Sequence, residues 1–290
     1  MTDGIQKVTI NDAEFPKLLK KISDPPKELY FRGNFILNDD CFAVVGTRMC
    51  SPYGRQMAME ITGDLTEAGL TIVSGLAPGI DTCSHQSVLE KKGKTIAVLG
   101  TGPDDTSIYP QINLKLAKDI VSSGGMLVSE YPPGTKGTRF AFPRRNRIIT
   151  GLSMGVLVVE AKEKSGSLLS AGWAKKQKRK IFAVPGQVHS LNSKGCHCLI
   201  KQGAKLVENA DDILRELSSF SFKRIQKKNL RGENEEENLL LKILEEEPLH
   251  TDKIIEKTKM PAGKIVGLLA ILEIKGKVIN LEEGIYAIKR

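Results

Sequence analysis

The 290-residue sequence predicts an α/β fold, with a doubly wound, mostly parallel sheet and a small C-terminal winged-helix domain. The first observation is a regular alternation of short runs rich in β-branched residues with longer amphipathic segments, which is typical of βαβ units. The second is that these runs are apolar throughout, as expected for parallel strands that are buried on both faces. The third is a cluster of three helical segments and a hairpin at the end of the sequence, which is the winged-helix pattern.

The apolar runs and the segments between them give the order of the elements. The expected strands are residues 41–46, 71–75, 95–100, 125–130, 154–160 and 180–186. The expected helices are residues 52–68, 81–91, 111–122, 144–152 and 167–177. Ser51 and Pro52 suit the start of the first helix, and Asp81 is a candidate cap for the second. Since right-handed crossovers bring the loops after the strands to one edge, we expect ligands at the carboxyl ends of the strands.

Changes in composition divide the chain into segments. They are an irregular lead-in (1–40), the sheet-containing core (41–218), a charged linker (219–238) and the winged-helix domain (239–290). The lead-in contains apolar residues at helical spacing from Phe15 to Ile22, and Pro25-Pro26 stops that helix. The linker changes from basic to acidic along its length.

The winged-helix domain is expected to contain three helices, LLLKILEEE, HTDKIIEKT and PAGKIVGLLAILEIKG, followed by the hairpin KVINLEEGIYAIKR. Thr251 or Asp252 is the expected cap of the second helix, because short oxygen-bearing side chains cap helices well. Gly276 closes the third helix, and Glu283-Gly284 lie in the turn of the hairpin.

The charge of the chain is uneven. The first 228 residues carry 33 Lys and Arg against 22 Asp and Glu, whereas the residues from Asn229 onward carry 10 against 12. A basic field of this kind favours polyanions such as nucleic acid, and it also serves solubility. Five cysteines with scattered spacing fit a reducing cytosol better than a disulfide framework. Without the form of a signal peptide or an apolar run long enough to span a membrane, we expect a cytoplasmic protein.

Catalytic and cofactor motifs are weak in this sequence. The sequence has four histidines, His85, His189, His197 and His250. None of them lies in a Gly-x-Ser-x-Gly nucleophile elbow or in a His-Glu-x-x-His metal-binding helix. Cys196-His197-Cys198 has no second cysteine pair, so it does not form the usual zinc pattern. Gly100-Thr101-Gly102 follows a strand but lacks the third glycine of a dinucleotide-binding turn. We expect no catalytic residue, metal or cofactor.

Glycine, hydroxyl and basic residues gather in three of the loops that follow strands. The loops are Gly46-Thr47-Arg48, the segment Ser74-Gly75 to Gly79, and the segment from Ala161 to Ser165-Gly166-Ser167. Small residues let the backbone approach a phosphate, and helix N-termini offer free N–H groups to anions. One such loop alone is also typical of a tightly packed turn, but three on one edge favour an anion-binding site. We interpret Asp81 as a cap or as a holder of its loop.

The segment 135–147 contains five basic residues and no acid: Lys136, Arg139, Arg144, Arg145 and Arg147. Phe140 and Phe142 lie between them. Arginine pairs with phosphate and aromatic rings stack on unpaired bases, so the combination favours single-stranded nucleic acid. Adjacent positions cannot all face one ligand, and Ile148, Ile149 and Leu152 have the helical spacing that would place the segment against the sheet.

Many motifs occur in one order between about Asp24 and about Val207: VVGTR, SPYGRQMA, SGLAPGID, VLGTGPD, YPQIN, SEYPPGT, FPRRNRIITGLS, VVEA, SGSLLSA, FAVPG and LIKQGA. Together they resemble the DNA-processing protein A family (DprA, also called Smf). The tail resembles the winged-helix appendage of that family. The resemblance implies a Rossmann-like core and a homodimer that binds single-stranded DNA and is not an enzyme. It also implies that the protein protects incoming DNA and loads the RecA recombinase onto it during natural transformation.

The resemblance also implies which residues bind DNA. Arg48 is the arginine of the GTR loop, Arg139 lies three residues before Phe142, and the Phe142 ring would stack on a base. Lys176 or Lys178 would extend the basic track. The complete set of expected DNA-binding residues is Gly46, Thr47, Arg48, Ser74, Gly75, Gly79, Arg139, Phe142, Arg145, Asn146, Ser165, Gly166, Ser167, Lys176 and Lys178.

Two positions depart from the pattern of the family. Gly195-Cys196-His197 stands where the family commonly has Gly-x-Asn, and Lys178 stands where a glycine often precedes Arg179. The family dimerises through the region that corresponds to Leu199 to Val207, so we expect the dimer contact there.

Two other functions fit parts of the sequence. Nucleotide-processing hydrolases of the phosphoribohydrolase type use a related fold, but PGTKGT (133–138) matches their motif only faintly and lacks its downstream glutamate. A sequence-specific regulator would read duplex DNA with the winged helix. The mildly acidic balance of the tail disfavours that reading, because phosphate contacts supply most of duplex affinity. We expect the tail to bind protein or to help assembly.

Overall fold

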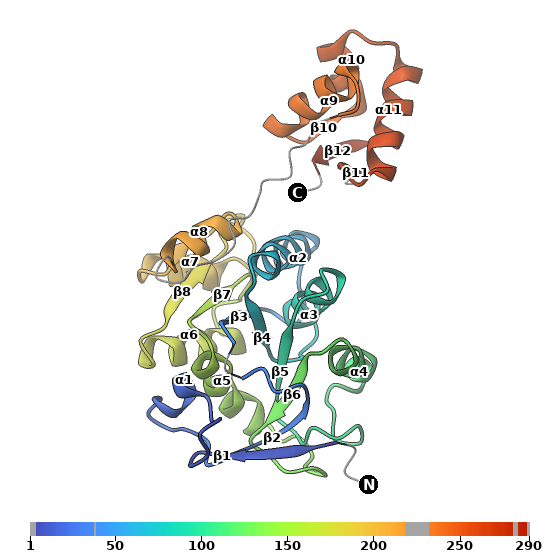
Figure 1. Ribbon diagram of the computed structural model, residues 1–290. Coiled ribbons are helices and arrows are strands. Elements are labelled where there is room, and N and C mark those ends of the chain that lie inside the picture. The colour runs from blue at the N-terminus through green and yellow to red at the C-terminus, as the bar shows by residue number, and fades with distance from the viewer. Residues whose placement is uncertain (1–3, 38, 218–231, 281–283, 289–290) are drawn as a thin grey trace. The chain divides into compact units, whose positions relative to one another are not determined.

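The computed structural model describes residues 4–37, 39–217, 232–280 and 284–288 (Figure 1). The chain divides into two compact units, residues 1–225 and 226–290. Within the described residues, a nine-stranded sheet forms the centre of the first unit, called the core unit below, and a three-stranded sheet belongs to the second, called the winged-helix unit. The predicted fold class, a mostly parallel α/β sheet followed by a winged helix, is confirmed.

The parallel part of the large sheet follows the predicted strands closely. Its strands are β3 (Cys41–Val45), β4 (Thr71–Ser74), β5 (Thr95–Leu99), β6 (Met126–Ser129), β7 (Gly155–Val158), β8 (Lys180–Ala183) and β9 (Lys205–Leu206). They lie in the order β6-β5-β4-β3-β7-β8-β9. The chain first proceeds from β3 toward β6 and then returns to place β7 on the other side of β3. The reversal makes the gap between β3 and β7 the switch point, where ligands bind in sheets of this type.

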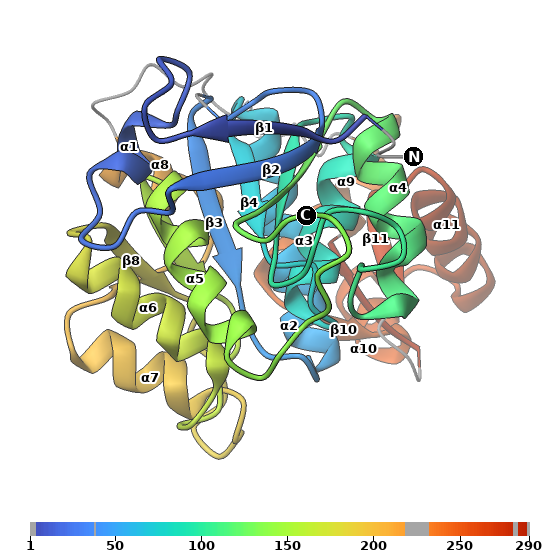
Figure 2. The same ribbon diagram turned by 90° about the horizontal axis from the view of Figure 1, so that it is seen from below.

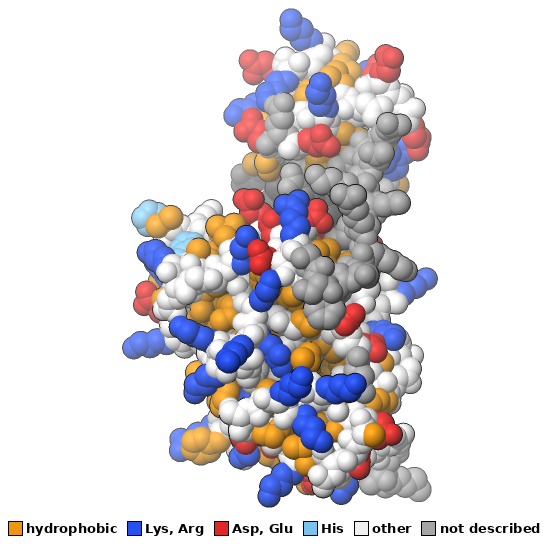
Figure 3. Space-filling view, turned by 60° about the vertical axis from the view of Figure 1, so that its left-hand side comes forward, with side chains coloured by type: hydrophobic (Ala, Val, Ile, Leu, Met, Phe, Trp, Pro, Cys, Tyr) orange, Lys and Arg blue, Asp and Glu red, His pale blue; other side chains and the backbone are white. Residues whose placement is uncertain are grey.

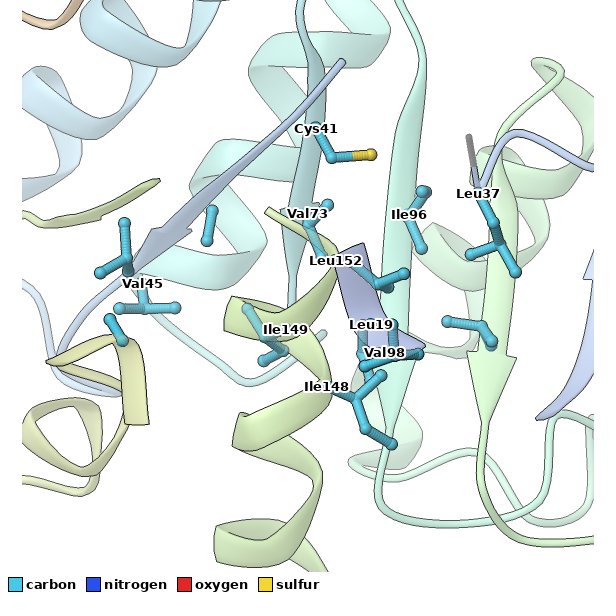
Figure 4. Close-up of a cluster of buried hydrophobic side chains, with 14 of the residues drawn as sticks. Leu19, Leu37, Cys41, Val45, Val73, Ile96, Val98, Ile148, Ile149 and Leu152 are labelled. Atoms are coloured by element: carbon cyan, nitrogen blue, oxygen red, sulfur yellow. The ribbon is translucent and has the colours of Figure 1, made fainter. Parts of the chain in front are cut away.

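Helices cover both faces of the sheet, as the two hydrophobic clusters show. The helices of the core unit are α1 (Lys17–Lys20), α2 (Pro52–Glu67), α3 (Ile80–Glu90), α4 (Leu114–Ser122), α5 (Ala141–Leu152), α6 (Gly166–Lys176), α7 (Lys194–Lys201) and α8 (Ala210–Glu216). Alternate residues of β3 point to opposite faces: Ala43 packs in the cluster with α1, α5 and α6, and Val44 packs with α2, α3 and α8. Figure 4 shows the first cluster, in which Ile148, Ile149 and Leu152 of α5 lie against the strands. The predicted apolar face of this segment is therefore confirmed.

The first 33 residues are not irregular, so the expectation of an irregular lead-in is wrong there. They contain β1 (Gln6–Thr9) and β2 (Glu28–Gly33), which pair antiparallel, and β2 pairs antiparallel with β6 at the edge of the large sheet. Buried residues alternate with partly exposed ones along β2, so neither a continuous apolar run nor a long periodic pattern marks it in the sequence. The expected helical turn is present as α1, with Leu19 fully buried.

The helix starts in the core unit confirm one prediction and correct two others. Ser51 caps α2, since its side chain accepts a hydrogen bond from the Gly54 N–H, and Pro52 is the first helical residue. Asp81 does not cap α3, because that helix begins at Ile80, after Gly79. Helix α5 begins at Ala141, three residues earlier than expected, so Phe142 lies on the same helix as the arginines that follow it.

The winged-helix unit contains α9 (Glu235–Glu246), β10 (Leu249–His250), α10 (Thr251–Thr258), α11 (Ala262–Ile274), β11 (Val278–Asn280) and β12 (Ile285–Ile288). Helix α9 starts inside the segment predicted as linker, and the part of that linker up to residue 231 lies outside the described residues. His250, rather than Thr251 or Asp252, caps α10 by accepting a hydrogen bond from the Asp252 N–H at 3.2 Å. Gly276 follows α11 with φ +66°, as expected of a helix-closing glycine.

None of the described helices is both long and apolar enough to cross a membrane.

The buried His85 of α3 makes the stability of the core unit depend on pH. Its Nδ1 lies 2.7 Å from the Thr95 hydroxyl, and burial, assisted by the charge of Arg145, lowers the pKa of His85 to about 3. In the unfolded chain a histidine has a pKa of about 6.5. Between these values the unfolded state binds the extra proton, so stability should fall as the pH drops from about 6.5, by up to about 1.4 kcal/mol per pH unit.

Urea unfolding between pH 5 and 7 measures this effect, with His85→Gln as the comparison. The variant should be less stable at pH 7 but should lose less stability than the wild type on acidification. Parallel pH curves for the two proteins would contradict the assignment.

Candidate nucleic-acid interface

A pocket of about 300 Å³ lies at the switch point of the large sheet. Its walls are the loop after β3, the first turns of α5, and the loop that leads from β7 into α6; α5 and α6 lie side by side (Figure 2). Nine of the residues predicted from the sequence line it: Gly46, Thr47, Arg48, Phe142, Arg145, Asn146, Ser165, Gly166 and Ser167. The structure therefore brings together segments that are up to 121 positions apart in the sequence, between Gly46 and Ser167.

The N-terminus of α6 forms one wall of this pocket. Ser165 caps the helix, accepting a hydrogen bond from the Ser167 N–H, and the two hydroxyl oxygens lie 2.8 Å apart. Gly166 is exposed, and no atom lies within 4 Å of the place where a side chain would begin. No acid occurs in the first turn. The positive end of the helix dipole and the open backbone at Gly166 therefore face the pocket, an arrangement that favours anions.

Two exposed cations lie beside this helix end. Arg48 projects from the loop after β3, and Lys162 from the loop after β7. Within the described part of the chain, neither side chain has an ion pair or a hydrogen bond to an acid. Both charges are thus available to a ligand in the pocket. Lys162 lies inside a loop that the sequence singled out, yet it was not among the predicted residues, because the sequence Lys162-Glu163-Lys164 does not show which side chain faces the pocket.

Arg145 differs from Arg48, because its guanidinium group is buried. Its Nη1 donates to the carbonyl oxygens of Gly75 and Val98, and its Nε donates to Asn146 Oδ1 at 2.9 Å. Asp81, also buried, lies 3.9 Å from Nη2. Burial lowers the pKa of Arg145, and the Asp81 carboxylate opposes that shift. Arg145 borders the pocket but is held by protein atoms, so its main role in the structure is to fasten α5 to β5 and to the loop after β4.

Asp81 holds the loop after β4, as one of the two interpretations from the sequence expected. Its carboxylate accepts hydrogen bonds from the N–H groups of Gly75, at 3.1 Å, and Ala77, at 3.4 Å. Burial raises the pKa of Asp81, whereas Arg145 and the backbone donors act in the opposite direction.

Three of the predicted glycines serve close packing. A Cβ at Gly75 would lie 2.2 Å from the Arg145 guanidinium, and a Cβ at Gly46 would lie 2.4 Å from Ile80. Gly79 has φ +79°, and a Cβ there would meet the Thr47 carbonyl oxygen at 2.3 Å. Ser74 is buried and donates to the Val44 carbonyl oxygen. The loop after β4 therefore supports the pocket from behind and gives it few lining atoms.

Phe142 and Asn146, four residues apart, lie on the same face of α5, and both border the pocket. Asn146 Nδ2 donates to the Gly166 carbonyl oxygen at 3.4 Å, which links α5 to the start of α6. The Phe142 ring packs between Gly100 and Gly137, where added Cβ atoms would lie 2.8 and 2.6 Å from it. The Tyr109 ring is 5.2 Å from that of Phe142.

The remaining predicted residues lie outside the pocket. The guanidinium of Arg139 covers the ring of Phe140 at 4.7 Å, and the Lys176 ammonium lies 5.0 Å from the Trp173 ring. Lys178 has φ +57°, a left-handed conformation that explains why a glycine suits this position. All three cations are exposed. On the side of the core unit that carries α6 and α7, most charged side chains in view are Lys and Arg (Figure 3).

The sequence left Arg144 and Arg147 undecided, and the structure separates them. Arg147 is fully buried, and it donates to Asp24 Oδ2 at 2.9 Å and to Glu130 Oε1 at 2.6 Å. Arg144 is exposed and lies 3.4 Å from Glu130 Oε2. The acids that pair with these arginines therefore come from outside the segment 135–147, where the sequence could not reveal them.

No group of three His, Cys, Asp or Glu side chains among the described residues is placed to hold a metal ion. His197, which stands where the family commonly has asparagine, is partly buried, and its Nε2 lies 3.0 Å from the Gly186 carbonyl oxygen.

The burial of Arg147 predicts a large effect on stability. Arg147→Ala should lower the free energy of unfolding by about 3 kcal/mol or more, because Glu130 would lose its buried partner. The matched change Arg144→Ala, at an exposed position beside the same acid, should cost under about 1 kcal/mol. Urea unfolding followed by circular dichroism measures both. Equal effects would show that the Arg147 ion pairs do not support the fold.

Comparison with known proteins extends these observations. A family model described as DNA recombination-mediator protein A matches residues 6–218, and one described as the DprA winged helix domain matches residues 226–284. DNA processing protein DprA of Bacillus subtilis is 44% identical over 216 residues, which is 74% of this chain and 72% of that protein. Protein Smf of Escherichia coli is 37% identical over 288 residues, which is 96% of this chain and 76% of that protein.

Two solved structures are similar to the core unit. The crystal structure of DprA from Streptococcus pneumoniae has a TM-score of 0.69 and 43% identity, and the match covers 76% of this chain and 75% of that one. A structure of DNA processing protein A from Helicobacter pylori, described for its single-stranded DNA binding mode, has a TM-score of 0.66 and 31% identity, covering 76% and 99%. By sequence and by structure, the chain belongs to the DNA recombination-mediator protein A family, the family of DprA and Smf.

Proposed function

We propose that this protein binds single-stranded DNA in the cytoplasm, protects incoming DNA, and loads the RecA recombinase in natural transformation and recombination, without acting as an enzyme. The observation that carries the proposal is the pocket at the switch point. There the N-terminus of α6 and two cations without acidic partners, Arg48 and Lys162, surround the open backbone at Gly166. A phosphate group of the DNA backbone fits this chemistry.

The aromatic residues beside the pocket favour single strands over duplexes. Phe142 borders the pocket and can stack only on a base that is free of its partner strand. The similar structure from Helicobacter pylori is described for its single-stranded DNA binding mode, which supports the same preference here. Proteins that bind single-stranded nucleic acid of any sequence usually combine a basic surface with aromatic side chains that stack on the bases.

Among the described residues of the winged-helix unit, the exposed face of the third helix is poor in groups that read duplex DNA. Helix α11 occupies the place of the recognition helix, and its exposed residues include Gly263, Val266, Gly267, Ala270 and Ile271. Such side chains present no donors or acceptors to base edges in the major groove. Of the exposed charged residues of the same helix, Lys264 forms an ion pair with Glu236, and Glu273 is an acid, which would repel a phosphate. We therefore favour a protein-binding or assembly role for this unit over sequence-specific regulation.

Dimerisation belongs to the proposal, and the edge of the large sheet beyond β8 supports it. There α6, β8, α7 and β9 enclose a groove of about 860 Å³. Strand β9 is the last strand of the sheet and carries Leu206, which is 42% exposed. An edge strand with an apolar side chain is suited to pairing with another copy. Two DNA sites on one dimer would raise the effective concentration of the second site for a long strand. The RecA-contacting surface stays unassigned to residues.

The alternative is a nucleotide-processing hydrolase of the phosphoribohydrolase type. Hydrolysis would need a carboxylate free to activate water or a leaving group. The carboxylate that borders the pocket is Asp81, which is held by two backbone N–H groups and by Arg145. Incubation with AMP and chromatography for free base separates the two functions: release of adenine would favour the hydrolase.

Arg48 is the position that tests the proposed DNA site. Arg48→Ala should weaken binding to oligo-dT and should flatten the dependence of log K on log salt by about 0.7, the value for one lost phosphate contact on a single strand. Fluorescence anisotropy over a salt series measures both quantities. Lys20→Ala, which removes an exposed charge from α1, is the control and should leave the slope unchanged. An unchanged affinity and slope for Arg48→Ala would refute the pocket as the DNA site.

Removal of the winged-helix unit tests its role separately. A chain that ends at residue 231 should keep its affinity for oligo-dT within about twofold, because the phosphate site lies wholly in the core unit. The full chain should also bind duplex DNA no better than the shortened one. A large loss of single-strand affinity would contradict the assignment of DNA binding to the core unit.

A further inference from the structure

We propose that Tyr109 is a second base-stacking position, which extends the DNA track from the pocket along the carboxyl edge of the sheet. Tyr109 lies in the connection between β5 and α4, and it does not line the pocket. Its ring is 56% exposed, although it contacts the ring of Phe142 at 5.2 Å. The inference rests on the proposed function, since it presumes that a single strand occupies the pocket.

Phe142 alone offers a limited stacking surface. Two glycines lie against its ring, so closely that a Cβ at Gly100 would be 2.8 Å and one at Gly137 2.6 Å from ring atoms. Tyr109 covers a further part of the ring at an angle of 42° between the planes. Phe142 is therefore half-buried and held by its neighbours. A ring in this setting can take one base, and the next base along the strand must find another surface.

Tyr109 provides such a surface and has no evident part in the core. It belongs to none of the hydrophobic clusters, and the described residues supply no hydrogen-bond partner for its hydroxyl group. The Tyr109 side chain is more than half exposed and is tilted against the Phe142 ring, which leaves part of its own ring open to solvent. Tyr and Trp rings placed in this way are well suited to binding, because they lose little conformational entropy when a partner stacks on them.

The charges around Tyr109 permit a polyanion to approach. Of the two acids in its loop, Asp105 is balanced by cations, since it pairs with Arg32 at 2.5 Å and with Lys118 at 3.0 Å, whereas Asp104 keeps its negative charge. Asp104 accepts hydrogen bonds from the Gly134 N–H and from two hydroxyl groups nearby. Arg139, in the segment just before α5, has no acidic partner within the described residues and stacks on Phe140, which is 70% exposed.

The topology gives the track a direction. The phosphate site lies between β3 and β7, and β5 is the second strand from β3 on the side away from β7. A single-stranded DNA whose phosphate is bound at the start of α6 would pass Phe142, on α5, before it reaches Tyr109. The ligand at Tyr109 is thus the same single-stranded DNA that binds in the pocket, contacted over at least one more nucleotide.

The experiment compares Tyr109→Ala, Tyr109→Phe and the control Ile112→Ala in the full-length protein. Ile112 is 83% exposed and lies three residues further on, but it has no π face. With a long oligo-dT, Tyr109→Ala should bind about tenfold more weakly, within the range for one lost base stack, and Tyr109→Phe should bind nearly as well as the wild type. The salt slope should stay unchanged in both, because no phosphate contact is lost. Ile112→Ala should bind like the wild type.

Photocrosslinking provides a second readout that does not depend on affinity. An oligo-dT that carries 5-iodouracil should crosslink to Tyr109, and mass spectrometry should locate the adduct. Full affinity of Tyr109→Ala together with the absence of a crosslink at Tyr109 would overturn the inference, as would an equal loss for Ile112→Ala. The proposed function fails separately: in that case the wild type itself would not bind oligo-dT, or Arg48→Ala would leave its binding unchanged.

Discussion

The Arg145 guanidinium makes the contacts on which the pocket at the switch point depends. It joins α5 to the loop after β4 and to the end of β5, and Gly75 leaves the room that it needs. Asp81 balances its charge and holds the same loop by the backbone. Because an unpaired charge in the interior costs several kcal/mol, these groups stabilise the structure only as a set. The set fixes the first turns of α5, and with them the positions of Phe142 and Asn146.

Burial divides the basic residues of this edge into two kinds. Arg145 and Arg147 are held by carbonyl oxygens and carboxylates, so a ligand would have to compete with strong internal contacts for them. Arg48 and Lys162 remain in solvent and keep their charge for an incoming anion. A surface cation without a partner loses little when it binds phosphate, since no internal ion pair has to break. This difference in burial explains how the start of α5 can both support the fold, through Arg145 and Arg147, and border the pocket at the switch point.

Much of the fold and part of the site could be predicted from the sequence. The buried parallel strands read as continuous apolar runs, and Ile148, Ile149 and Leu152 showed the face of α5 that packs on the sheet. Residue type alone could not distinguish Arg145 from Arg48, because burial depends on partners such as Asp81 and Val98 that are distant in the sequence. The glycines at 46, 75 and 79 suggested an open backbone, whereas the structure uses them for close packing.

The geometry also separates the two contributions that a single strand would need. The start of α6, with Arg48 and Lys162, offers charge and N–H groups, which recognise phosphate and carry no information about sequence. The rings of Phe142 and Tyr109 belong to α5 and to the connection after β5, and they offer π faces, which accept any base. Neither set presents a pattern of donors and acceptors to base edges, so a single strand held at this edge would be bound without sequence preference. The salt-dependent part of that affinity would arise at Arg48, Lys162 and the start of α6, and the salt-independent part at the rings on α5 and on the connection after β5.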